Sequence, residues 1–374
     1  MTNVAERYNP NGLNLRTMEQ KNRETQIDER ILELHKQALV IDSHNDAIVA
    51  HIRRGNVSIA DENVQNPMDP VGTIAYLRGR VPPEEEAIGI QLNIPKMRQG
   101  GIDAAFFAVD VTRAWKNHLA YALDAFGWFN EEVTANADDL CIARKASDIL
   151  EAKASGKLAA ILVIENSEAV ERSLNILRSL YLLGVRSIGL THNLNTWAST
   201  GNDEEDMGGG LTRFGMALVK EMNRLGMLVD VSHISERGFW DVLEISDSPV
   251  IASHSNCKTL CRHSRNLSNE QLKALSVNGG VVGITFVPGF LTIDGWQKMP
   301  PLAQLLNHIA YAIDIAGIDH VGIGSDFDGG GDLLKDASEF IKIAEGLSER
   351  GYSDADIRKV LGENHLRVFE AACG

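Results

Sequence analysis

The sequence predicts one closed parallel (β/α)8 barrel, and the chain length and the pattern of apolar segments are the observations that predict it. Eight short apolar runs rich in β-branched residues each precede a longer segment with helical spacing, which is the alternation of a parallel barrel. The 374 residues suit a single large barrel. An open doubly wound sheet, the alternative, usually has a glycine-rich first turn. The nearest candidate, 322–327, departs from the GxGxxG template and follows the last strand.

The predicted strands and helices alternate along the whole chain. The strands are 38–44, 102–111, 158–165, 185–192, 227–233, 249–254, 280–287 and 320–326. The clearest helical segments are 167–183, 214–225, 268–277 and 302–316, with a longer helical end at 353–372. We expect a polar tail at 1–25 and a single barrel domain at 26–374. An irregular insertion at about 56–85 follows the first strand, and loops of that length often cover a functional site.

Composition excludes several classes of protein. Hydrophobic residues make up 44% and charged residues 23% of the chain, as in ordinary folded proteins rather than disordered or fibrous ones. The 36 basic and 51 acidic residues give a net charge of −15, which argues against a nucleic-acid partner. The first 30 residues lack an apolar signal region, and the uncharged stretch 274–293 is interrupted by glycine and proline. We therefore expect a cytoplasmic protein with no membrane partner.

Histidines and carboxylates gather where the predicted strands end. The chain has 11 histidines, and four of them fall at these ends together with three carboxylates: His44 and Asp46, Glu165, His192, His233, His254 and Asp326. A single histidine at a strand end is usually structural. Catalytic groups of such barrels project from the carboxyl ends of the strands, so seven chemically active side chains at these ends predict an active site.

The residue types and their spacing favour two metal ions. His44 and Asp46 are two residues apart and so point to the same face of their strand. His233 and His254 supply two further nitrogens, and Glu165 lies between the two pairs in strand order, where its carboxylate could bridge two cations. Imidazole and carboxylate suit Zn²⁺, with manganese or another divalent metal as the alternative. Two such ions lower the pKa of a shared water and polarise a carbonyl group.

Seven strings resemble the membrane dipeptidase (renal dipeptidase) family of metallopeptidases, within the amidohydrolase-type barrels. They are IDSHND, THN, DVSH, ASHSN, HSRN, GIGSDFDG and LGENHLRVF, and the similarity runs from about residue 30 to the C-terminus. The resemblance implies a binuclear zinc site made by His44, Asp46, Glu165, His233 and His254.

The same resemblance implies roles for three further residues. His192 would contact the substrate and stabilise the tetrahedral oxyanion, and Asp326 would move a proton from the metal-bound hydroxide to the leaving amine. Arg265, which alone would be taken for a surface residue, would bind the free carboxylate of a dipeptide, because its planar guanidinium pairs with a carboxylate through two hydrogen bonds. Two neighbouring acids have other expected places. Asp42 lies deeper on the face of His44, and Asp328 points elsewhere and would cap a loop.

Two departures from the family pattern concern the substrate pocket. Asn166 follows Glu165 where the family usually has glycine, and a side chain there would narrow the pocket or bond the substrate. Phe286 stands where some relatives aim a tyrosine at the substrate. We therefore count Asn166 and Phe286 among the substrate-binding candidates and leave the identity of the substrate open.

The predicted function is that of a binuclear zinc dipeptidase in which a hydroxide bridging the metals attacks the amide bond. The resemblance also implies tolerance of a D-residue at the C-terminal position and a homodimer. One alternative is another amidohydrolase-type hydrolase, but many of those begin with His-x-His and use a lysine on strand four, unlike this chain. A second alternative is a biosynthetic tailoring enzyme that uses the same metal site on a peptide natural product.

Overall fold

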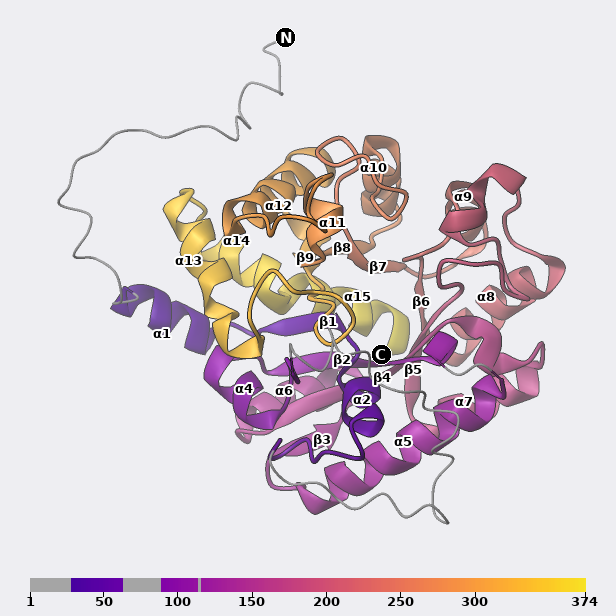
Figure 1. The fold of residues 1–374 in the computed structure, drawn as a ribbon, viewed down its shortest axis with the longest axis horizontal. Helices are drawn as coiled ribbons and strands as arrows, with labels where there is room; N and C mark the ends of the chain where they lie inside the picture. Colours follow the sequence, from indigo (N-terminus) through magenta and orange to yellow (C-terminus); the bar gives the residue numbers. More distant parts are fainter. Residues whose placement is uncertain (1–27, 63–88, 114–115) are drawn as a thin grey trace, which may run out of the picture.

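Eight parallel strands close into a barrel in the computed structural model, which describes residues 28–62, 89–113 and 116–374 (Figure 1). Each strand is hydrogen-bonded to the next around the ring, and pairing of β2 with β4 completes the circle. The (β/α)8 barrel is therefore confirmed. Its strands are β1 (Ile41–Asn45), β2 (Ala104–Asp110), β4 (Leu158–Glu165), β5 (Val185–Gly189), β6 (Leu228–Asp230), β7 (Ile251–Ser255), β8 (Val281–Ile284) and β9 (Val321–Ile323).

One further strand lies outside the eight-membered ring. β3 (Leu140–Ile142) pairs with the first three residues of β4, from Leu158 to Ala160. The pairing of β4 with β5 begins only at Leu162, so β3 fills the free edge of β4 before β5 begins. A three-residue strand has too short a pattern to be recognised in the sequence, and we did not predict it.

Helices surround the strands (Figure 1). Predicted segments 214–225, 268–277 and 302–316 correspond closely to α8, α10 and α12. Side chains of Thr212, Ser235 and Ser268 accept hydrogen bonds from backbone amides at the starts of α8, α9 and α10. The helices are α1 (Glu29–Gln37), α2 (Ala47–Arg53), α4 (Ile94–Gly100), α5 (His118–Ala135), α6 (Ala146–Ala154), α7 (Leu174–Leu183), α8 (Arg213–Leu225), α9 (Glu236–Ile245), α10 (Asn269–Val277), α11 (Pro288–Leu291), α12 (Leu302–Ala316), α13 (Ile341–Glu349), α14 (Asp354–Arg358) and α15 (Asn364–Cys373).

Two predicted helices are divided. The segment 167–183 forms a 3₁₀ turn, η5 (Ser167–Val170), and then α7, because Glu171 and Arg172 adopt left-handed conformations with φ of 48° and 58°. The helical end at 353–372 consists of α14, a π-helical turn, η9 (Lys359–Glu363), and α15. The remaining short turns are η4 (Val111–Arg113), η6 (Asn202–Met207), η7 (Ile318–His320) and η8 (Ala337–Glu339).

The core has two parts, one inside the barrel and one between the barrel and its helices. All residues of β2 and β4 are buried, as expected of parallel strands covered on both faces. Inside the barrel, Phe106 meets Phe369 of α15 edge to face at 5.8 Å, so the last helix closes the end of the barrel at which the strands begin. The opposite end is left for the functional site.

Several predicted strands end earlier than expected, and three of them carry predicted site residues. β5, β6 and β9 end at Gly189, Asp230 and Ile323, so His192, His233 and Asp326 each lie three residues further on, in loops. The φ angles of His233 and Asp326, 65° and 63°, are left-handed and cannot continue a strand. Catalytic side chains of barrel enzymes commonly occupy such loops.

Several expectations concern residues outside the described ranges. The tail 1–25 lies entirely outside them, and of the predicted insertion 56–85 only 56–62 is described. Among the helices that the structure describes, none has the length and apolar character needed to cross a membrane.

Candidate metal centre

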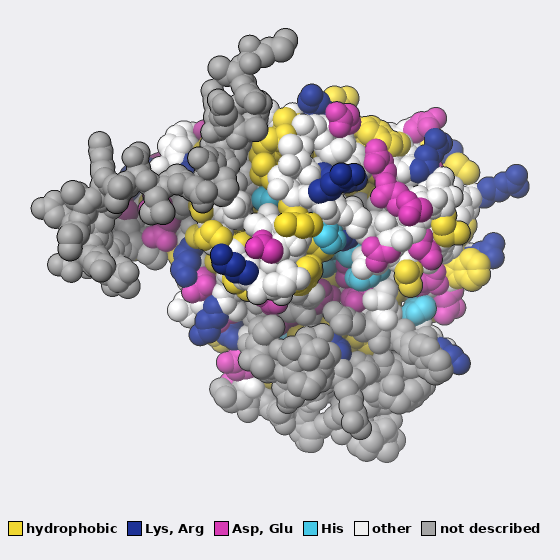
Figure 2. Space-filling view, turned by 45° about the horizontal axis from the view of Figure 1, so that its top comes forward, with side chains coloured by type: hydrophobic (Ala, Val, Ile, Leu, Met, Phe, Trp, Pro, Cys, Tyr) yellow, Lys and Arg dark blue, Asp and Glu magenta, His cyan; other side chains and the backbone are white. Residues whose placement is uncertain are grey.

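The loops at the carboxyl end of the barrel enclose a cavity of about 340 Å³. Figure 2 shows histidine side chains near the middle of one face of the molecule, with acidic side chains beside them. The cavity is lined by Asp46, Asp110, Glu165, His192, Asn193, Asp203, His233, His254, His263, Ser264, Arg265, Val287, Phe290, Trp296, Asp326, Gly329 and Gly330. Most of the residues that the sequence singled out therefore come together here.

Glu165 is the centre of the cluster, and its two carboxylate oxygens face different partners. Oε2 lies 3.7 Å from Nε2 of His44, which is itself 3.8 Å from Oδ2 of Asp46. Oε1 lies 3.0 Å from Nε2 of His233 and 3.4 Å from Nε2 of His254. The five predicted metal ligands are thus neighbours, and each oxygen of Glu165 lies nearest to different histidines.

The donor atoms of these residues fit divalent metal ions. Among the described residues, buried Nε2 of His44 and buried Oδ1 of Asp46 have no hydrogen-bond partner, although unpaired buried polar atoms are costly. The Nε2 atoms of His233 and His254 face each other at 2.8 Å. The site thus offers three imidazole nitrogens and the carboxylate oxygens of Asp46 and Glu165. Zinc and similar ions bind ligand sets of this kind.

Charges in the cluster shift the pKa values in opposite directions. Burial alone would lower the pKa of His44, but the charges of Glu165 and Asp46 outweigh it and raise the pKa to about 10. Burial, and secondarily the positive charges nearby, lowers the pKa of His233 and His254 well below the usual value. The carboxylates of Glu165 and Asp46 therefore favour a positive charge at His44, whether a proton or a metal ion. His233 and His254 are neutral, which is the form of imidazole that coordinates metal.

The predicted substrate residues His192 and Asp326 both line the cavity. The His192 ring stacks on that of His233, with centroids 4.2 Å apart. One potential ligand atom from each of Asp326, His44 and Asp46 lies within 4.8 Å of the other two, close enough for the three to bind one metal ion. A side chain at Gly329 would collide with Asp46 and Asp326, so the loop after β9 packs directly on the carboxylates.

Arg265 is buried at the cavity rather than on the surface. Its side chain donates to the carbonyl oxygen of His254 at 3.0 Å and lies over the Phe290 ring at 5.4 Å. Burial lowers the pKa of its guanidinium to about 10, so it stays charged at neutral pH. Its buried Nε has no hydrogen-bond partner among the described residues, which leaves a donor for an anionic ligand.

Asp42 and Asp328 occupy places that match their expected supporting roles. Asp42 lies below the ligands and accepts hydrogen bonds from the backbone N–H and the hydroxyl of Ser325, both at 2.7 Å. Asp328 accepts from the backbone N–H groups of Gln91 and Leu92 at 2.8 and 3.1 Å. Burial raises the pKa of both carboxyls to about 7.

The two predicted specificity residues are not among the residues that line the cavity. Phe286 is fully buried and packs against the rings of Phe327 and Phe340 at 5.4 and 5.9 Å, which does not fit the substrate contact we expected. Asn166 has a φ of 84°, and its side chain accepts from the backbone N–H of Glu168. This left-handed conformation explains why glycine suits the position. The Asn166 side chain caps the start of η5 instead of entering the cavity.

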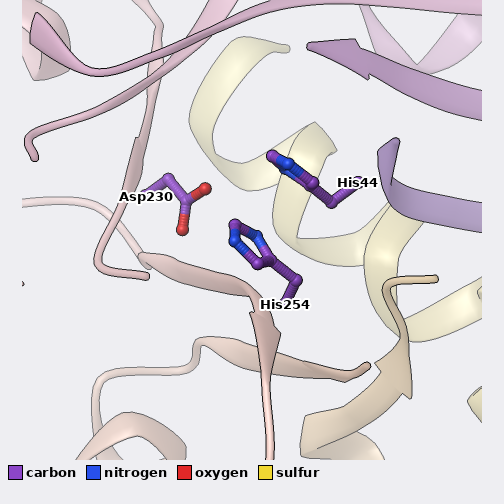
Figure 3. A group of neighbouring side chains, drawn as sticks. All are labelled: His44, Asp230 and His254. Carbon is purple, nitrogen blue, oxygen red and sulfur yellow. The ribbon is translucent and has the colours of Figure 1, made fainter. Parts of the chain in front are cut away.

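Asp230, which was not predicted, lies beside His44 and His254 (Figure 3). Its position at the end of β6, in the DVSH string, was a signal that could have found it. Asp110, also not predicted, pairs in register with Glu165 across β2 and β4. The aromatic wall made by Phe290 and Trp296 could not have been placed without the loop conformation.

Comparisons with known proteins identify relatives of this chain among the dipeptidases. Residues 28–373 match the family model described as membrane dipeptidase (peptidase family M19). The chain is 40% identical over 239 residues to dipeptidase verJ of Clonostachys rogersoniana, a match that covers 63% of this chain and 61% of that protein. The aligned part thus spans less than two thirds of this relative.

Solved structures extend the similarity over nearly the whole chain. A metallopeptidase from Rhodobacter sphaeroides, crystallised with a phosphinate mimic of the dipeptide L-Ala-D-Ala, superposes with a TM-score of 0.78 at 27% identity and covers 90% of this chain and 99% of its own. A family M19 metallopeptidase named dipeptidase AC gives a TM-score of 0.78 at 28% identity with the same coverage. The chain therefore belongs to the membrane dipeptidase family, peptidase family M19.

Proposed function

We propose that this protein is a dipeptidase that uses two divalent metal ions, with zinc as the first candidate. The observation that supports this most directly is the position of Glu165, whose two oxygens face His44 on one side and His233 and His254 on the other. In this proposal, His44 and Asp46 would hold one ion, His233 and His254 would hold the second, and Glu165 would contribute to both sites. When bound, the two ions lower the pKa of a shared water and polarise the scissile carbonyl.

The protein side chains around the ligands bind and orient the dipeptide. The buried guanidinium of Arg265 pairs with the C-terminal carboxylate, and its Nε, which has no partner among the described residues, is one donor available for this. His192 stabilises the oxygen that becomes negative as the amide carbon becomes tetrahedral. Asp326 accepts a proton at its carboxylate and passes it to the nitrogen of the leaving amine. A solved relative bound to a mimic of L-Ala-D-Ala supports a dipeptide substrate, including one with a C-terminal D-residue.

A dipeptide panel with measured metal content tests this proposal. Protein loaded with zinc should contain two ions per chain and hydrolyse free dipeptides, with L-L and L-D members compared directly. A carboxyl-amidated dipeptide serves as the matched poor substrate. Failure of the two-zinc protein to hydrolyse any free dipeptide would overturn the proposed activity, and hydrolysis with one ion per chain would overturn the binuclear site.

A further inference from the structure

We propose that Asp230 and Ser253 are positioning residues that hold His254, and more weakly His44, in the tautomer that metal binding requires. This inference rests on the metal centre proposed above. Neither residue lines the large cavity, and the mechanism does not use them. Both lie directly beneath the metal ligands, in a space of about 10 Å³ that also borders His44 and Glu165. Such a space admits at most about one water molecule.

A chain of hydrogen bonds runs from the carboxylate to the two rings. The hydroxyl of Ser253 is hydrogen-bonded to Oδ2 of Asp230. The same Ser253 oxygen lies 2.8 Å from Nδ1 of His254 and 3.5 Å from Nδ1 of His44. The two rings are 3.8 Å apart at their centroids. One serine oxygen thus contacts both imidazoles on the side away from Glu165 (Figure 3 shows the carboxylate and the two rings).

The direction of these hydrogen bonds follows from the number of protons available. A carboxylate only accepts, and the other oxygen of Asp230 already accepts from the backbone N–H groups of Ser232 and Ser253 at 2.9 and 3.1 Å. Ser253 has a single hydroxyl proton, which it donates to Asp230. Towards the ring, 2.8 Å away, its oxygen can then only accept, so Nδ1 of His254 carries the proton. The other neighbour of this oxygen is the Ser232 hydroxyl, at 3.4 Å. Nε2 is left with a lone pair on the side of Glu165, where the metal would bind.

Asp230 could instead be taken for a metal ligand, since it groups with His44 and His254 within 4.8 Å. Its hydrogen bonds argue against this. Both of its oxygens already accept hydrogen bonds from protein groups, three in total. By contrast, the ligand atoms Nε2 of His44 and Oδ1 of Asp46 have no partner among the described residues. Asp230 therefore acts on the metal through Ser253 and the imidazoles.

Two variants test the proposal through metal affinity rather than activity alone. Asp230→Asn keeps the shape of the side chain, but its NH₂ would donate to Ser253, so the serine proton would turn towards Nδ1 of His254 and place the ring proton on Nε2. Ser253→Ala removes the connection altogether. Ser187→Ala is the matched control, because this buried serine borders the same small space but donates to the backbone carbonyl of Leu228 at 3.0 Å.

Zinc affinity and stoichiometry are measured by competition with a chelator, and thermal unfolding is followed in the metal-free protein. We expect Asp230→Asn and Ser253→Ala to bind zinc about 10- to 100-fold more weakly, whereas Ser187→Ala binds it as the wild type does. The double variant should bind no more weakly than the weaker single variant, because the two residues act as one chain. Asp230→Asn should leave the metal-free unfolding temperature nearly unchanged.

Two results would overturn the proposal. Wild-type zinc affinity in Asp230→Asn would show that the carboxylate does not set the tautomer, even if Ser253→Ala failed to fold. If Asp230→Asn bound only one zinc ion per chain, as tightly as the wild type binds it, Asp230 would be identified as a ligand of the missing ion. Neither result depends on dipeptide hydrolysis, so failure of this inference is distinguishable from failure of the proposed activity.

Discussion

Glu165 concentrates the chemistry of the site in a single side chain. Its carboxylate is buried and within 3.7 Å of three imidazole nitrogens. Burial raises its pKa well above the usual value despite the opposing charge of His44. A buried carboxylate of this kind needs positive charge around it. The metal ions proposed above would supply that charge, so replacing Glu165 tests the proposed centre most directly.

Replacing Glu165 with glutamine should abolish turnover and weaken metal retention. Glutamine has nearly the same shape but is neutral and offers one acceptor oxygen, so it cannot bind two cations. Metal content after dialysis and hydrolysis of a free dipeptide are measured together. Glu168→Gln, three residues further along and outside the cavity lining, is the control and should keep both properties. Normal kcat in Glu165→Gln would contradict the bridging role.

Arg265 is the residue for which the sequence context was most misleading, because it follows a strand and looks like a surface arginine. The Arg265→Ala variant should raise KM for a free dipeptide by about 10-fold or more, since a charged hydrogen bond at a buried site contributes about 1.5–3 kcal/mol. The same variant should change little for a carboxyl-amidated substrate. Exposed Arg262 provides the control substitution. Equal losses on both substrates would argue against carboxylate recognition.

The loop after β9 brings several parts of the site together. It contains Asp326 and Gly329, and Asp328 fixes it to the segment that follows the predicted insertion through the backbone of Gln91 and Leu92. In return, the backbone N–H of Asp328 donates to the side chain of Gln91 at 2.7 Å. The position of the Asp326 carboxylate therefore depends on a contact between segments about 240 residues apart in the chain.

The burial of Asp328 in this contact should make stability depend on pH. Burial raises the pKa of Asp328 from 3.8 to about 7, so the folded state binds its proton more tightly than the unfolded state. The stability that this group contributes is greatest below about pH 4 and is lost as pH rises towards 7. Asparagine at this position does not titrate, so the unfolding free energy of Asp328→Asn should rise relative to that of the wild type as pH increases. Between pH 5 and pH 8 this difference should grow by about 2 kcal/mol. Urea denaturation of the metal-free proteins at several pH values measures this, and a difference that stays constant with pH would contradict it.

Strand positions were predictable from the sequence because buried parallel strands leave continuous apolar runs, as in 158–165, which is β4 without change. Loop conformations were not predictable in the same way. The left-handed turns at His233 and Asp326 depend on contacts with other loops and leave no apolar pattern. The same reason explains Phe286, whose burial against Phe327 and Phe340 is decided by packing between distant segments.

For the molecule as a whole, the closeness of the proposed ligands was predictable because each lies at or just beyond the end of a strand, and a closed barrel brings all such ends to one place. The supporting residues were harder to predict. Asp230 carries a signal in the DVSH string, but only the register of β6 against β7, with Asp230 opposite Ile251, places its side chain beside that of Ser253. Cytoplasmic location and a dimeric state stay predictions.

Removing the metal should lower the stability of the whole barrel without unfolding it. The ligands come from β1, β4, β7 and the loops after β1 and β6, so ions bound there connect strands around much of the ring. The hydrophobic core, including α15 at the opposite end, does not depend on them. A chelator should therefore lower the unfolding temperature, and added zinc should restore it by an amount that grows with zinc concentration. Circular dichroism should show unchanged secondary structure in the metal-free protein at 25 °C. An unfolding temperature that zinc does not shift would contradict a metal centre at this end of the barrel.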